Sequence, residues 1–116
     1  MSHPNLSAIK AVRLFSSLQE DDLKNLAMIA ERVSFRSGAT IFREGQSGSA
    51  MFILTSGTVR VLKRSPHDRI DEEIAEMGPG TYVGLTALID PAPRTSTVAA
   101  VAPTSSLLFL FSPLFF

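Results

Sequence analysis

The residues with the clearest capacity for chemistry lie in one short stretch, where Arg94 is followed by the hydroxyl residues Thr95, Ser96 and Thr97. Arginine presents a planar fork of N–H donors that matches phosphate oxygens, and hydroxyl groups add further donors. Gly84, earlier in the same region, would let the backbone approach a ligand closely, and a short helix after it would direct free N–H groups at an anion. These residues predict a phosphate-binding site.

No arrangement of residues is typical of an enzyme. The sequence shows no nucleophile–base pair, carboxylate dyad or glycine-rich triphosphate loop, so we predict a non-enzymatic protein without catalytic residues. The chain has no cysteine, which excludes disulfides, thiolate catalysis and cysteine-rich metal sites. His3 and His67 are far apart and have no acidic or cysteine neighbours at metal-ligand spacing, so we expect no metal and no cofactor.

Composition narrows the class of partner. The chain has 116 residues, of which eleven are basic and eleven acidic, so nothing indicates direct binding to nucleic acid or to an anionic membrane. The N-terminus lacks the apolar run of a signal peptide. The apolar tail, LLFLFSPLFF, is too short to span a bilayer, which needs about 20 apolar residues. We expect a cytoplasmic protein with no membrane span.

The period of the apolar residues changes once along the chain. A spacing of about three between residues 6 and 15 predicts a helix, and a second helix is expected to start near 18–20, where carboxylates crowd the first turn. After Val33 the period becomes two, and glycines separate short β-forming stretches. One of them, LTSGTVRVL, is interpreted as a hairpin with its turn at Ser56 and Gly57.

Short strands at this spacing predict a mainly β fold, an antiparallel eight-stranded β-roll of the jelly-roll type with N-terminal helices. We interpret residues 1–116 as a single domain. Its expected parts are a helical segment (1–32), the β-roll (33–112) and a truncated helix start (113–116). The apolar C-terminal residues are expected to mediate self-association, because exposed patches of this kind often become contacts.

Two sequence signatures resemble those of the cyclic-nucleotide-binding domain family, which includes the catabolite activator protein and the regulatory subunit of protein kinase A. The first is IFREGQSGSAMFILTSGTVRV, in which Gly45, Gly48 and Gly57 frame an apolar run. The second is MGPGTYVG followed by GLTALIDPAPRTSTVA, which resembles the approach to the phosphate-binding cassette and the cassette itself. The resemblance covers roughly residues 14–112 and implies a ligand site at the following positions: Gly84, Leu85, Thr86, Ala87, Leu88, Arg94, Thr95 and Ser96.

The resemblance implies that Arg94 pairs with the cyclic phosphate of cAMP or cGMP. Backbone N–H groups between Leu85 and Leu88, and the hydroxyl of Thr95 or Ser96, would assist. Leu85 stands where the family has a glutamate that grips the ribose 2′-hydroxyl, and Ser96 stands in place of an alanine. A lost charge-assisted hydrogen bond costs about 1.5–3 kcal/mol, or roughly ten- to a hundredfold in affinity.

Several interpretations therefore remain open. The first is a regulatory domain that senses a cyclic nucleotide or another phosphorylated small molecule. The second is a degenerate fold that serves as a structural or protein-interaction module, and the third is the detached sensor half of a bacterial transcription regulator. Without the resemblance, the residue types alone would indicate that Arg94 is a solvated surface charge and that Leu85 packs in the core. We expect Arg94 to be required for the ligand and not for the fold.

Overall fold

The change of period marks the point at which the chain passes from helices to strands. The computed structural model describes residues 4–46, 50–84 and 93–110. Helix α1 (Pro4–Lys10), a 3-10 turn (Arg13–Phe15) and helix α2 (Glu20–Ile29) precede the strands. Helix α2 begins within the predicted range and carries three carboxylates in its first turn, as expected from the helix dipole.

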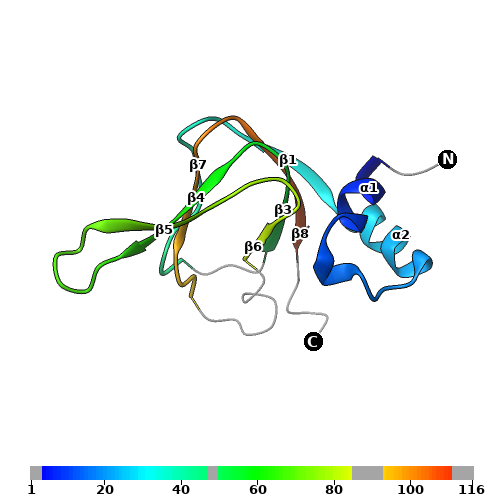
Figure 1. Ribbon diagram of the computed structural model, residues 1–116, viewed down its shortest axis with the longest axis horizontal. Coiled ribbons are helices and arrows are strands. Elements are labelled where there is room, and N and C mark those ends of the chain that lie inside the picture. The colour runs from blue at the N-terminus through cyan, green and yellow to red at the C-terminus, as the bar shows by residue number, and fades with distance from the viewer. Residues whose placement is uncertain (1–3, 47–49, 85–92, 111–116) are drawn as a thin grey trace.

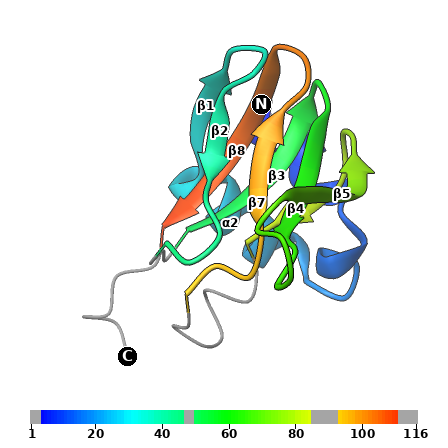
Figure 2. The ribbon, with the colours of Figure 1, turned by 90° about the vertical axis from the view of Figure 1, so that its left-hand side faces the viewer.

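The strands form two four-stranded sheets (Figure 1, Figure 2). The first has the order β1-β8-β3-β6 and the second β2-β7-β4-β5, and every pair of neighbours is antiparallel. Their bounds are β1 Glu31–Phe35, β2 Thr40–Phe42, β3 Ala50–Ser56, β4 Val59–Arg64, β5 Asp71–Met77, β6 Tyr82–Val83, β7 Thr97–Ala100 and β8 Thr104–Leu110. The mainly β fold is confirmed, with eight strands among the described residues.

Strand β1 begins at Glu31, two residues before the start predicted for the roll, because Glu31 and Arg32 already pair with Leu108 and Leu107 of β8. The segment 113–116, expected to start a helix, lies outside the described residues, as does the rest of the apolar tail from residue 111.

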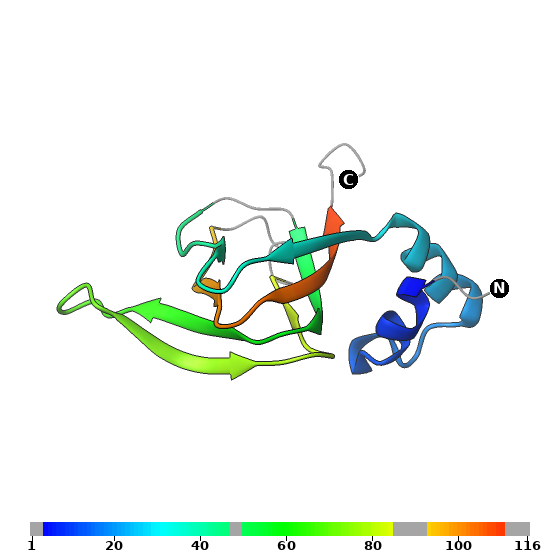
Figure 3. The same ribbon diagram turned by 90° about the horizontal axis from the view of Figure 1, so that it is seen from above.

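The hairpin predicted at Ser56 and Gly57 is wrong. Strand β3 pairs with β6 and β8, whereas β4 pairs with β5 and β7, so the chain crosses here from one sheet to the other. The short glycine-containing connection satisfies the sequence pattern of a hairpin without forming one. The true hairpin joins β4 to β5 and projects from the end of the roll opposite the helices (Figure 1, Figure 3). Its tip holds the charged stretch between Ser65 and Ile70.

Gly57 is required at this crossing for two reasons. Its φ is +87°, which is the left-handed region, and a Cβ would contact the Pro103 carbonyl oxygen and lie 2.5 Å from Thr104 Oγ1. We expect Gly57→Ala to lower the free energy of unfolding by about 2 kcal/mol, measured by urea denaturation. Gly57→Asn is the control, since asparagine tolerates positive φ. It should not restore stability, and full recovery in that variant would mean that crowding is unimportant.

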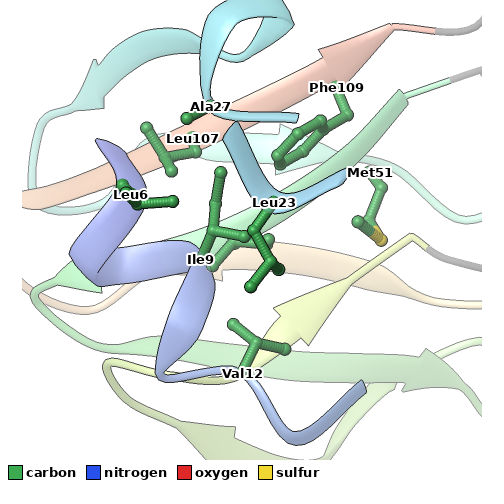
Figure 4. Packing of buried hydrophobic residues seen from close by; sticks show 9 residues of the cluster. Leu6, Ile9, Val12, Leu23, Ala27, Met51, Leu107 and Phe109 are labelled. Carbon is green, nitrogen blue, oxygen red and sulfur yellow. The ribbon is translucent and has the colours of Figure 1, made fainter. Parts of the chain in front are cut away.

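The apolar run of β3 serves two cores. Its residues Met51 and Ile53 pack against the helices in a cluster that also holds Leu6, Ile9, Val12, Leu23, Ala27, Leu107 and Phe109 (Figure 4). Phe52 and Leu54, on the other face of the strand, pack inside the roll with Phe42, Ala50, Val59, Val61, Val83 and Val98. A strand buried on both faces reads as a continuous apolar run instead of an alternating one. Two members of this second cluster, Phe42 and Ala50, also contact Arg94.

Candidate anion-binding site

Arg94, the residue predicted to meet a phosphate, is buried. The residue is only 7% exposed, which excludes the interpretation as a solvated surface charge. Nη2 donates a hydrogen bond of 2.8 Å to the carbonyl oxygen of Ala50, and Nη1 donates one of 3.3 Å to that of Gly84. The ring of Phe42 lies against the guanidinium, with its centroid 4.2 Å from Cζ. The side chain therefore lies between the start of β3, the end of β6 and the end of β2.

The backbone of Arg94 is fixed by the loop that follows β2. Its N–H donates to the carbonyl of Gln46 at 2.9 Å, and its carbonyl accepts from the N–H of Gly45 at 2.7 Å. Next to this pair, the N–H of Glu44 donates to Thr97 Oγ1 at 2.8 Å. These contacts join the two sequence signatures, because they bring the GQ dipeptide of the first to the arginine of the second.

The structure gives Gly84 a role that the sequence did not indicate. Its φ is +87°, and a Cβ there would lie 2.7 Å from Nη1 of Arg94 and 2.8 Å from the carbonyl oxygen of Ala50. A side chain would thus collide with the guanidinium and with its acceptor. Glycine at this position makes room for Arg94, and a ligand is not needed to explain it.

The charge of Arg94 is not neutralised within the described part of the chain. The two ion pairs found there are Lys10–Glu20 and Arg64–Asp71, so no carboxylate of the described residues lies within 4 Å of the guanidinium. Nε is buried and has no hydrogen-bond partner among the described residues. Burial lowers the pKa of Arg94 from its ordinary value, yet arginine retains its proton in proteins. A buried cation without a counter-ion is costly unless an anion approaches it.

The remaining predicted site residues fall into two groups. Thr95 is exposed and Ser96 is half-buried, and both follow Arg94 in the segment before β7. The Thr95 carbonyl accepts a 3.0 Å hydrogen bond from Nζ of Lys63 on β4. The other four, Leu85, Thr86, Ala87 and Leu88, lie outside the described residues.

Sequence reasoning missed the two residues that contact the guanidinium from elsewhere in the fold. Ala50 uses its backbone carbonyl, a contact for which the sequence carries no signal. Phe42 is visible in the sequence as the aromatic residue of IFREG. Its contact with Arg94, however, depends on the pairing of β2 with β7. Both contacts depend on tertiary structure and not on local pattern.

The described segments contain no group of three or more His, Cys, Asp or Glu residues placed to hold a metal ion. In the same segments, no helix has the length and apolar character needed to cross a membrane. The described part of the site consists of one buried cation, backbone groups and an aromatic ring.

The fold is a β-roll with helices at one end, and its candidate site holds a buried arginine. Residues 32–115 match the family model described as the cyclic nucleotide-binding domain. The chain therefore belongs to the cyclic nucleotide-binding domain family, as the two signatures indicated.

Relatives and solved structures agree with this assignment. The chain is 36% identical over 108 residues to a cyclic nucleotide-gated potassium channel of Mesorhizobium japonicum, covering 93% of this chain and 28% of the channel. It is 31% identical over 88 residues to the CRP-like cAMP-activated global transcriptional regulator of Mycobacterium tuberculosis, covering 76% of this chain and 39% of the regulator. It spans less than two fifths of either relative.

Among solved structures, a cyclic nucleotide-binding-like protein of Brucella abortus is 31% identical, with a TM-score of 0.78. The match covers 91% of this chain and 90% of that one. The regulatory domain of Toxoplasma gondii PKA, solved with cAMP, superposes with a TM-score of 0.87 at 24% identity, covering 90% of this chain and 40% of that one. At that identity the likeness supports the fold alone.

Proposed function

We propose that this domain is a non-enzymatic sensor of a cyclic nucleotide, cAMP or cGMP, and that Arg94 anchors the cyclic phosphate. The observation that carries the proposal is the buried guanidinium, which has no carboxylate partner in the described segments and whose Nε has no hydrogen-bond partner there. A single phosphate would supply both the charge and the acceptor that are missing. A guanidinium already paired with a carboxylate of the protein would gain much less from binding a phosphate.

The hydrogen bonds of the guanidinium also support a role in binding phosphate. Its two terminal nitrogens each donate one hydrogen bond to a backbone carbonyl, which leaves three of the five N–H donors of arginine for other acceptors. We propose that N–H groups between Leu85 and Leu88, together with the hydroxyl of Thr95 or Ser96, complete the anion site. The ligand would be a small molecule with one exposed phosphate.

Binding can be tested by thermal unfolding with cAMP, cGMP, 5′-AMP and inorganic phosphate, each at millimolar concentration. A ligand at a hundred times its dissociation constant stabilises the folded state by about 2.7 kcal/mol, so Tm should rise by several degrees for at least one cyclic nucleotide. 5′-AMP and phosphate should raise it less, because neither presents the cyclic monoanion. An unchanged Tm with both cyclic nucleotides would contradict the proposal at affinities relevant to sensing.

A second function is favoured by a specific observation. Arg94 bridges the carbonyls of Ala50 and Gly84, so it holds β3 and β6 together whether or not a ligand binds. The arginine could therefore be retained in a domain that has become a structural or protein-interaction module. Leu85 in place of the family carboxylate points in the same direction. The two functions differ in their expected response to substitution of Leu85.

A further inference from the structure

We propose that Phe42 is a positioning residue for the phosphate anchor, and that the face of its ring orients the Arg94 guanidinium toward the anion. This inference rests on the proposed function and concerns a residue outside the predicted cassette. Phe42 is the last residue of β2 and is 8% exposed. Its ring centroid lies 4.2 Å from Cζ, well within the roughly 6 Å over which a cation interacts with an aromatic face.

The ring restrains a motion that the hydrogen bonds do not. The bond from Nη2 to Ala50 is short, at 2.8 Å, but the bond from Nη1 to Gly84 is 3.3 Å and correspondingly weak. One strong bond leaves the guanidinium free to swing about that contact. A ring against one face of the plane limits the swing, and Nε remains without a hydrogen-bond partner among the described residues.

An aromatic ring suits this role better than a carboxylate would. Its negative face attracts the buried cation without carrying a formal charge. A carboxylate at the same place would neutralise Arg94 and repel a phosphate. Phe42 thus helps to keep an unpaired guanidinium inside the protein while its charge remains available to a ligand.

Phe42 is itself held by its neighbours. Its ring packs on Phe52 with centroids 6.2 Å apart and an interplanar angle of 31°. Phe52 in turn makes an edge-to-face contact with Phe35, with centroids 6.0 Å apart. The three rings form a row inside the roll, and the cation–aromatic contact lies at the Phe42 end. Phe35, at the other end, is the matched control.

The test compares Phe42→Leu with Phe35→Leu, and Phe42→Tyr serves as the conservative variant that keeps the ring face. Dissociation constants for cAMP and cGMP are measured by isothermal titration calorimetry, and stability by thermal unfolding. Both leucine variants should lose stability, since each removes a ring from the same cluster. Phe42→Leu should in addition weaken binding about threefold to thirtyfold, the range expected for loss of a cation–aromatic contact.

In Phe35→Leu, binding should stay within about twofold of the wild type, and Phe42→Tyr should recover most of the affinity lost in Phe42→Leu. These limits lie well below the weakening expected of the leucine variant. Equal affinities of wild type and Phe42→Leu would overturn the inference. An equal loss in both leucine variants would also overturn it, because general loosening of the core would then explain the effect.

A second measurement separates this inference from the proposed function. In ligand-free protein labelled with ¹⁵N, the Nε–H and Cδ proton signals of Arg94 should be shifted upfield by the ring above them. The shift should disappear in Phe42→Leu and persist in Phe35→Leu. If the wild type binds no cyclic nucleotide but shows this pattern, Phe42 positions Arg94 while the sensor function fails. If the wild type shows no ring-current shift, the positioning role is refuted. This result needs only the wild type, so it holds even if Phe42→Leu does not fold.

Discussion

Arg94→Met is expected to abolish measurable cyclic-nucleotide binding and also to destabilise the domain. Methionine keeps much of the apolar stem but removes the charge and all five N–H donors. Loss of two or more charge-assisted hydrogen bonds to a phosphate, at about 1.5–3 kcal/mol each, should weaken binding at least a hundredfold. Isothermal titration calorimetry with cAMP and cGMP measures this directly.

The loss of stability in Arg94→Met follows from burial. The carbonyls of Ala50 and Gly84 would lose the hydrogen bonds that they accept from the guanidinium, and a buried polar group left unpaired costs about 1–3 kcal/mol. This revises the expectation from sequence that Arg94 is dispensable for the fold. Urea denaturation of the variant gives the change in free energy of unfolding.

Two controls make the Arg94 result interpretable. Arg60→Met removes an exposed cation from β4 and should change neither affinity nor stability appreciably. Arg94→Lys keeps the charge without the planar fork, and its affinity should fall between those of wild type and Arg94→Met. Should Arg94→Met bind as tightly as wild type, the ligand lies elsewhere in the protein.

The fold was largely predictable because its signals are local. The change of period after Val33 and the carboxylates that open α2 both follow from patterns within a few residues. The crossing at Gly57 was not predictable in this way. A glycine turn between two β-forming stretches fits a hairpin and a crossing equally well, and the choice depends on whether β3 finds β8 and β6 as partners.

The candidate site was predictable only in part, for a related reason. The donor geometry of Arg94 and the resemblance of its surroundings identify a phosphate anchor from residue types alone. Burial of that side chain, its stacking on Phe42 and its bond to Ala50 arise from segments forty or more residues away. Gly84 shows the same limit, because its contact with Arg94 assigns it a packing role that its sequence position cannot reveal.

The double role of Arg94 means that its presence alone does not distinguish a sensor from a relic. An arginine kept for the fold and one kept for a ligand would show the same two bonds to backbone carbonyls. A sensor and a relic differ instead in the contact expected at the ribose of the ligand. Leu85 occupies that end by resemblance, and leucine accepts no hydrogen bond, so the decisive substitution restores an acceptor there.

Leu85→Glu is expected to tighten cAMP binding by about 1.5–3 kcal/mol, roughly ten- to a hundredfold, if the new carboxylate reaches the 2′-hydroxyl. The wild type is expected to bind at micromolar concentrations or more weakly. Gly84, the residue before position 85 in the sequence, accepts a hydrogen bond from Nη1 of Arg94. A carboxylate that pairs with Arg94 would neutralise the anchor and reduce the gain.

Calorimetry on wild type and Leu85→Glu, with 2′-deoxy-cAMP beside cAMP, separates these effects. A sensor with a weakened ribose contact predicts tightening for cAMP and none for the 2′-deoxy compound, because only the former offers the hydroxyl. Leu85→Gln is the matched control: it restores an acceptor without a charge, so it should gain less than glutamate but cannot neutralise Arg94. Nanomolar binding by the wild type would refute the interpretation of Leu85. A third outcome is that wild type, Leu85→Glu and Leu85→Gln all fail to bind any cyclic nucleotide, while Arg94→Met still loses stability. The arginine would then serve the fold, and the domain would be better described as a structural module.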